Sequence, residues 1–189
     1  MLPFQLFLTP ESFRNHPGVR LILRHLSALG DTFAHPAEVE SLAAGDPLIY
    51  EFVDLRDGLS GSMLSFGLTV IQPGTIGGEY YVTKGHFHAA QQDGDEVYLG
   101  VSGTGLLLLQ SRQGESRAIE LTPGAILYTP LAWAHRTVNI GADPLVFFSI
   151  WPSATAYDYE EISRRGGFPQ RVMDQNGRPA LVTNPAFHI

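Results

Sequence analysis

The feature of this sequence that most restricts its fold is a succession of short apolar runs between residues 48 and 152. The runs are rich in aliphatic and aromatic residues, and Gly, Pro or Asn interrupts them roughly every ten residues, as in closely spaced antiparallel strands. The predicted strands are residues 48–55, 66–71, 79–82, 96–101, 105–110, 117–121, 125–128, 136–140 and 145–151. Because no long helical pattern separates them, the sequence predicts an all-β sandwich or barrel, with the double-sheet jelly roll as the leading architecture.

The flanking segments carry weaker patterns. Apolar residues recur at three- and four-residue steps over residues 19–29, which predicts an amphipathic helix. Residues 32–47 are expected to be irregular with one helical turn. A short helix is predicted at residues 158–165, and Asn176-Gly177 marks a hairpin turn. We interpret residues 1–189 as a single domain, made of an N-terminal segment 1–47, a barrel core 48–152 and a C-terminal extension 153–189.

Charge and composition narrow the classes of partner. Twelve Lys and Arg residues stand against nineteen Asp and Glu residues, which gives a net charge of -7, and the basic residues are scattered. The sequence therefore predicts no nucleic-acid partner, but it leaves room for a small anion in one cleft. There is no basic leader and no apolar run of the roughly 18 residues that a membrane span needs. We expect a cytoplasmic protein without a membrane partner.

A set of three histidines and one glutamate is the strongest chemical signal. No cysteine is present, so any metal must be held by imidazole and carboxylate groups. His86 and His88 are separated by one residue, and in a strand both imidazoles project to the same face. Glu96 and His135 complete a donor set that suits Fe(II), Mn(II), Ni(II) or Zn(II). A lone H-x-H pair is usually an ordinary strand feature, so the spacing of the whole set carries the prediction.

The first part of that set resembles the first motif of the cupin superfamily, G-x5-H-x-H-x3,4-E-x6-G. His86, His88, Glu96 and Gly103 match it. Tyr80 stands where the leading glycine belongs, and seven residues rather than three or four separate His88 from Glu96. This longer segment makes Asp93 and Asp95 alternatives to Glu96 as the carboxylate ligand.

The second cupin motif, G-x5-P-x-G-x2-H-x3-N, follows in the correct order. It is matched by Gly124, Pro130, His135 and Asn139, with Ala132 in place of the middle glycine. The resemblance implies a cupin double-stranded β-helix, a jelly-roll barrel with a short N-terminal helix and peripheral helical turns. It also implies one divalent metal ion per subunit, with Fe(II) as the leading candidate.

Several segments in order resemble the cupin-type glucose-6-phosphate isomerases of archaea and a few bacteria. They are residues 67–75, 81–88, 96–98, 103–110, 123–130, 133–141 and 158–159. The resemblance implies interconversion of glucose 6-phosphate and fructose 6-phosphate, with the metal bound to the O1 and O2 oxygens of the sugar. A cis-enediol route with Glu96 as the base and a metal-assisted hydride shift both remain open.

The same resemblance assigns roles to individual residues. Catalysis is expected at Glu96, His88 and Tyr98, and the metal is expected at His86, His88, Glu96 and His135. Thr69, Thr83 and Gly85 are assigned to the phosphate, and Tyr50 and Tyr159 to the sugar. Trp151 and Tyr157 depart from the Tyr and His that archaeal relatives tend to carry. Lys84 and Arg136 are expected to point away from the site.

Other readings of the sequence stay open. The donor set also fits another metal cupin, such as a dioxygenase, a decarboxylase or a different sugar isomerase. A sugar-binding cupin without turnover is a rival from the binding class, and a storage-type cupin is the least favoured. Residues 1–47 could cover a sheet edge or exchange with a partner, which predicts a homodimer.

Overall fold

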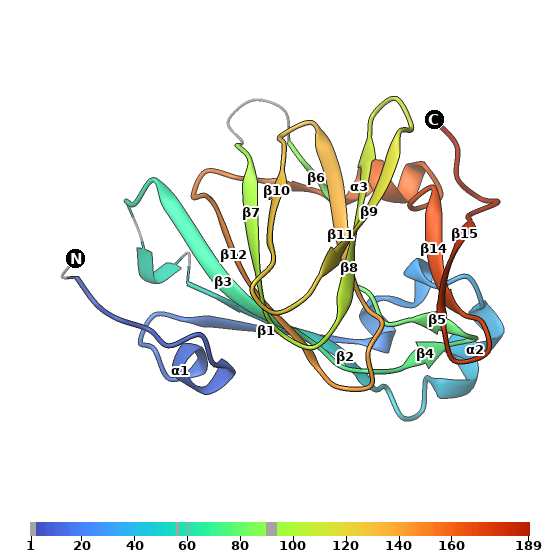
Figure 1. The fold of residues 1–189 in the computed structure, drawn as a ribbon, viewed down its shortest axis with the longest axis horizontal. Helices are drawn as coiled ribbons and strands as arrows, with labels where there is room; N and C mark the ends of the chain where they lie inside the picture. The colour runs from blue at the N-terminus through green and yellow to red at the C-terminus, as the bar shows by residue number, and fades with distance from the viewer. Residues whose placement is uncertain (1–2, 56, 60, 90–93) are drawn as a thin grey trace.

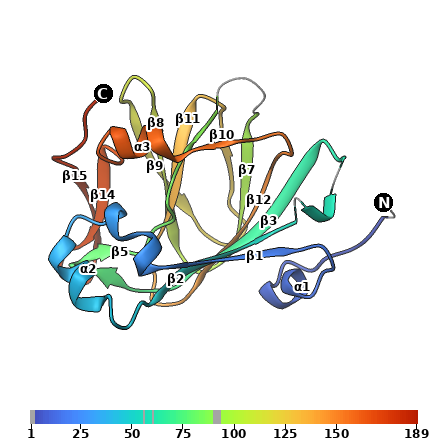
Figure 2. The same cartoon turned by 180° about the vertical axis from the view of Figure 1, so that it is seen from behind.

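The computed structural model describes residues 3–55, 57–59, 61–89 and 94–189, and it shows two facing layers of antiparallel strands (Figures 1 and 2). One layer is a six-stranded sheet in the order β1-β2-β3-β12-β7-β10. Its strands are β1 (Arg20–His25), β2 (Leu48–Asp54), β3 (Leu64–Ile71), β12 (Leu145–Pro152), β7 (Glu96–Ser102) and β10 (Ile126–Thr129). All of its strand pairs are antiparallel.

The opposing layer is built from smaller sheets. A three-stranded sheet contains β11 (Trp133–Asn139), β8 (Gly105–Ser111) and β9 (Ser116–Leu121), and a two-stranded sheet pairs β6 (Phe87–His88) with β13 (Tyr157–Asp158). A four-stranded sheet holds β4 (Thr75–Ile76), β5 (Glu79–Tyr80), β14 (Gln170–Asp174) and β15 (Pro179–Thr183). The all-β jelly-roll prediction is confirmed, because two strand layers enclose one main core.

The main core lies between the layers, where aliphatic and aromatic side chains meet. It includes Ile49, Ile71, Leu107, Val138 and Phe147, all of them buried. A second cluster, with Phe13, Val53 and Leu68 among its members, lies where α1 covers the six-stranded sheet. Both faces of β2 and β3 are covered, so nearly every residue of these two strands is buried or half-buried.

Helices occupy only the periphery. The α-helices are α1 (Pro10–Arg14), α2 (Pro36–Leu42) and α3 (Tyr159–Arg164), and the 3-10 turns are η1 (Leu26–Ala28), η2 (Gly30–Thr32) and η3 (Asp57–Leu59). The predicted C-terminal helix and hairpin are confirmed by α3 and by the β14–β15 pair. No helix in the described ranges has the length and apolarity that crossing a bilayer requires.

The helix predicted at residues 19–29 is wrong. The chain instead forms β1, the edge strand of the six-stranded sheet, followed by the 3-10 turn η1. Leu21 and Leu23 are 46% and 45% exposed, whereas Ile22 and its even-numbered neighbours face the cavity. The side chains therefore alternate with a period of two, and pairing with β2 overrides the helical spacing of the apolar residues.

Candidate active site

The four predicted metal ligands come together at one end of the cavity between the layers. His88 belongs to β6, Glu96 begins β7, and His135 lies in β11. His86 is joined to His135 by reciprocal backbone hydrogen bonds, with N–H to carbonyl distances of 3.2 and 3.1 Å. One ligand atom from each of the four side chains lies within 4.8 Å of the others.

The distances fit ligands that share one cation. The Glu96 Oε2 atom lies 3.3 Å from His88 Nε2 and 3.2 Å from His135 Nε2. Two adjacent ligands placed about 2.0–2.2 Å from a common ion are separated by about 2.8–3.6 Å in octahedral or tetrahedral geometry. Three of the four residues are buried, with His88 only 1% exposed, and His86 is half-buried.

The hydrogen bonding of His88 supports the same conclusion. Its Nδ1 lies 2.8 Å from the carbonyl oxygen of Gly94, which can only accept, so Nδ1 carries the hydrogen. In the neutral ring, Nε2 then presents a lone pair toward the carboxylate oxygen of Glu96. Two lone pairs facing each other in a buried site favour a cation between them, and a backbone partner on the other ring nitrogen is the usual outer-shell support of a ligating histidine.

Electrostatics keep Glu96 charged. Burial disfavours the carboxylate. When protons rather than a cation lie between the groups, hydrogen bonds from the His135 and His88 rings outweigh burial and hold the pKa of Glu96 well below its usual range. Burial raises the pKa of the Tyr98 hydroxyl well above its usual value. The charge of Glu96 and the hydrogen bond with Glu96 raise it further. Tyr98 is therefore a protonated donor directed at the carboxylate.

The alternative carboxylate ligands do not join the cluster. Asp95 is exposed and accepts a hydrogen bond from the backbone N–H of Leu131 at 2.9 Å. A further hydrogen bond from Tyr128 lowers the pKa of Asp95. Asp93 lies outside the described residues. Of the described carboxylates, only Glu96 meets the three imidazoles.

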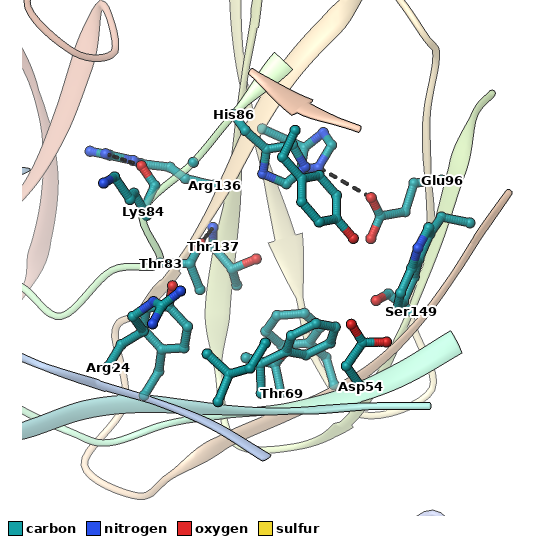
Figure 3. Close-up of a pocket in the computed structure, with 18 of the residues that line it drawn as sticks. Arg24, Asp54, Thr69, Thr83, Lys84, His86, Glu96, Arg136, Thr137 and Ser149 are labelled. Atoms are coloured by element: carbon teal, nitrogen blue, oxygen red, sulfur yellow. Dashed lines mark hydrogen bonds and ion pairs between the residues drawn. The ribbon is translucent and has the colours of Figure 1, made fainter. Parts of the chain in front are cut away.

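A cavity of about 430 Å³ opens beside the cluster, a size suited to a small metabolite (Figure 3). The predicted residues that line it are Tyr50, Thr69, Thr83, Gly85, His86, Glu96, Tyr98, His135 and Tyr159. His88 is fully buried and is absent from the lining. Trp151 and Tyr157 also line the cavity, so both departures from the archaeal pattern face the site.

The prediction that Lys84 and Arg136 point away from the site is wrong, because both line the cavity. Gly85 has a φ of +71°, so the chain around Lys84 does not follow the alternation of a strand. The Arg136 side chain passes close beside Gly85, and its Nη2 donates to the Lys84 carbonyl oxygen at 2.9 Å. Burial is the main cause that lowers the pKa of Arg136 to about 10.

Other lining residues carried no recognisable motif. They are Arg20, Ile22, Arg24, Phe52, Asp54, Thr137, Phe147 and Ser149. The alternation of Arg20, Ile22 and Arg24 in an apolar segment was the available signal, and the helical interpretation obscured it. Thr137 donates its backbone N–H to the Thr83 hydroxyl oxygen at 3.0 Å, which leaves the Thr83 hydroxyl hydrogen for another acceptor.

Two tyrosines border the cluster from the C-terminal side. β13 pairs with β6, which places Tyr157 opposite His88. The ring centroids of Tyr157 and Tyr159 lie 4.5 and 5.5 Å from that of His86. Two aromatic rings thus border His86.

Comparisons with known proteins give a consistent result. A family model described as "Glucose-6-phosphate isomerase (GPI)" matches residues 34–184. The glucose-6-phosphate isomerase of Thermococcus gammatolerans is 38% identical over 173 residues, covering 92% of this chain and 90% of the relative. That of Pyrococcus abyssi is 39% identical over 172 residues, covering 90% of each chain.

Among solved structures, oxalate decarboxylase from Bacillus subtilis superposes with a TM-score of 0.44 at 24% sequence identity. The superposition covers 54% of this chain and 24% of the decarboxylase chain. This chain thus spans about a quarter of that protein's length.

Proposed function

Because the chain belongs to the glucose-6-phosphate isomerase family, we propose that it interconverts glucose 6-phosphate and fructose 6-phosphate. The observation that carries the proposal is the convergence of three imidazoles and one carboxylate in the wall of a cavity large enough for a sugar phosphate. The family match favours this reaction over the dioxygenase, decarboxylase, sugar-binding and storage alternatives.

The metal is proposed to be one Fe(II) ion per subunit, held by His86, His88, Glu96 and His135; Mn(II), Ni(II) and Zn(II) suit the same donors. When bound, such an ion supplies Lewis acidity to the carbonyl and hydroxyl oxygens at C1 and C2 of the sugar. The burial of three of the four donors and the lone pairs that face each other support this assignment.

Glu96 is proposed to carry the proton between C1 and C2. Its carboxylate lies in the cavity wall beside the ligand cluster, where its oxygens are placed to accept a proton from the sugar. Tyr98 donates a hydrogen bond to Glu96 and thereby fixes the direction of the carboxylate. His88 holds the other side of the same group at 3.3 Å.

Solvent exchange tests the cis-enediol route against the direct hydride shift. If Glu96 carries the proton, isomerisation in D2O introduces deuterium at C1 or C2 of the product, because a carboxylic acid exchanges with water. A hydride shift transfers the hydrogen without exchange. Product mass after a single turnover distinguishes the two routes.

Thr69 and Thr83 are proposed as hydroxyl donors to the phosphate, with Gly85 contributing its backbone N–H. Tyr50 and Tyr159 are proposed to contact the sugar. All five line the cavity. Packing also explains why a glycine stands at position 85, because a Cβ there would lie 2.7 Å from the Phe168 ring. The glycine is thus required by the protein's own packing.

Trp151 and Tyr157 are proposed to close the pocket by shape. Trp151 is almost fully buried and packs on Phe52, with ring centroids 5.7 Å apart. An indole fills more volume than the phenol of archaeal relatives and has no hydroxyl to donate. Restoring the tyrosine with Trp151→Tyr tests whether this departure alters the Michaelis constant for the sugar phosphate.

We further propose a single domain, a cytoplasmic location and a homodimer. A single buried cluster joins residues from Leu26 to Val172, which supports one domain. The edge strand β1 exposes Leu21 and Leu23, which supports association through that edge. Sedimentation of a monomer alone at micromolar concentration would contradict the dimer.

The isomerase proposal is tested by a coupled assay with metal add-back. Protein stripped with a chelator should be inactive on fructose 6-phosphate, and Fe(II) or Mn(II) should restore formation of glucose 6-phosphate. Glu96→Gln, which keeps the shape and removes the charge, should lose most of the rate. Inactivity with every restored metal would refute the proposal.

A further inference from the structure

Three cationic side chains gather at one end of the cavity. Figure 3 shows Arg24, Lys84 and Arg136 on one side, with Asp54 and Glu96 on the opposite side. The cations come from β1, from the segment before β6, and from β11. The cavity therefore has a positive end, and the metal ligands lie at the opposite end.

Arg136 is fixed in place. It is only 5% exposed, its guanidinium lies 4.6 Å above the centre of the Phe168 ring, and its Nη2 donates to the Lys84 carbonyl oxygen. Within the part of the chain that the structure describes, no group accepts a hydrogen bond from the Arg136 Nε. A buried donor of this kind is costly unless an anion or water completes its bonding.

Among the described residues, charge compensation at the positive end is incomplete. Within the described part of the chain, no ion pair joins Arg24, Lys84 or Arg136 to a carboxylate. The charge of Glu79 acts on Arg136, but Glu79 is itself paired with Arg171 at 2.9 Å. A surplus of positive charge therefore faces the cavity.

Tyr50 connects the three cations. Burial raises the pKa of its hydroxyl, while the charges of Arg24 and Arg136 and a hydrogen bond to the Lys84 backbone oppose that rise. Arg24 also forms a hydrogen bond with the Tyr50 side chain. Lys84 Nζ lies 5.4 Å from the ring centre of Tyr159, and both residues line the cavity.

Arg20 provides an internal contrast. It lies on the same strand and the same face as Arg24, and it lines the same cavity. Its charge is compensated, because Nη2 lies 3.1 Å from Asp54 Oδ2 and Nε lies 3.9 Å from Asp57 Oδ2. Arg20 and Arg24 thus lie on the same strand, but of these two only Arg20 has its charge compensated by a described carboxylate.

We propose that Arg24, Lys84 and Arg136 form a cationic wall that recognises the phosphate dianion and orients the substrate. The inference deepens the proposed function and rests on it. Thr69 and Thr83 supply neutral hydroxyl donors, whereas the cationic wall supplies the compensating charge. The sugar then points its reacting carbons toward the metal ligands at the opposite end.

The polarity also determines the class of substrate. A sugar with one phosphate on the carbon remote from C1 and C2 matches both ends of the cavity.

The test compares Arg24→Met with Arg20→Met in the metal-loaded protein. Arg24→Met should raise both the KM for fructose 6-phosphate and the inhibition constant of inorganic phosphate about tenfold. Its kcat should stay within about twofold of that of the unmodified protein. Arg20→Met should change each constant less than about twofold. Arg24→Lys, which keeps the charge, should recover most of the affinity that Arg24→Met loses. Added salt should raise the KM more steeply in the unmodified protein than in Arg24→Met.

Equal constants for Arg24→Met and Arg20→Met would overturn the cationic wall, as would a fall in kcat with KM unchanged. A failure of the isomerase proposal can be told apart from a failure of the cationic wall. If the unmodified protein does not isomerise fructose 6-phosphate, the rise in Tm that inorganic phosphate causes can be measured in the same variants. This measurement still tests whether the cationic wall binds phosphate. Stabilisation lost in Arg24→Met and kept in Arg20→Met supports the wall, and equal stabilisation refutes it.

Discussion

Replacement of Gly85 by alanine should destabilise the protein through two separable costs. Gly85 has a φ of +71°, where an L-residue with a side chain costs about 1–2 kcal/mol. A Cβ there would lie 2.7 Å from the Phe168 ring and 3.0 Å from the Arg136 Cβ. Overpacking of this kind costs a further 1–3 kcal/mol or so. Gly85→Ala is therefore expected to lower the free energy of unfolding by about 2–5 kcal/mol.

A matched control isolates the backbone cost. Gly124 has a φ of +83°, and a Cβ built there meets nothing within 4 Å. Gly124→Ala should cost about 1 kcal/mol, since only the backbone conformation is penalised and the alanine also reduces the entropy of the unfolded chain. The difference between the two variants measures the packing of Gly85 against Phe168 and Arg136.

Urea denaturation of the metal-free protein, followed by circular dichroism, measures both free energies. For a chain of this length, about 2–5 kcal/mol corresponds to a fall in Tm of roughly 5–15 °C. Equal losses for Gly85→Ala and Gly124→Ala would refute the assignment of a packing role to Gly85. A normal Gly85→Ala stability with raised KM for fructose 6-phosphate would instead point to a direct role in binding.

Three further predictions follow from the site and its surroundings. His135→Ala should reduce bound metal from one equivalent per chain to less than about 0.1, measured by elemental analysis, because it removes one of four donors; unchanged metal content would exclude His135 as a ligand. Tyr98→Phe should lower kcat about 10- to 100-fold with KM within threefold, since the donor to Glu96 is lost; equal kcat values would exclude the positioning role. Arg171→Leu should lower the free energy of unfolding by about 3–5 kcal/mol in urea titrations, because it leaves the buried Glu79 carboxylate without its ion pair; a loss under 1 kcal/mol would contradict that pairing.

The sequence predicted the strands and the four clustered side chains because both follow from local rules. Two histidines one residue apart share a strand face, and the turn formers delimit each strand. The structure brings His86, His88, Glu96 and His135 within reach of one another despite seven residues between His88 and Glu96. The sequence could not decide which carboxylate joins the three histidines, because that choice depends on contacts between distant segments. The backbone N–H of Leu131 donates to the Asp95 carboxylate, which does not join the cluster.

The errors arise where tertiary context overrides local spacing. β1 has apolar residues at helical steps, but an adjacent strand with unpaired backbone groups selects the extended form. Lys84 was misplaced because Gly85 interrupts the alternation assumed for the segment that includes His86. Arg136 was misplaced because its length carries the guanidinium past a residue without a side chain.

The reciprocal backbone hydrogen bonds between His86 and His135 have a consequence for metal exchange. They fix the separation of two ligands through the sheet itself, so the chain does not depend on an ion to bring these donors together. A preorganised site of this kind loses little conformational entropy on chelation. Depleted and loaded forms should therefore share one fold, and different divalent ions could replace one another in the cell without refolding, according to their supply.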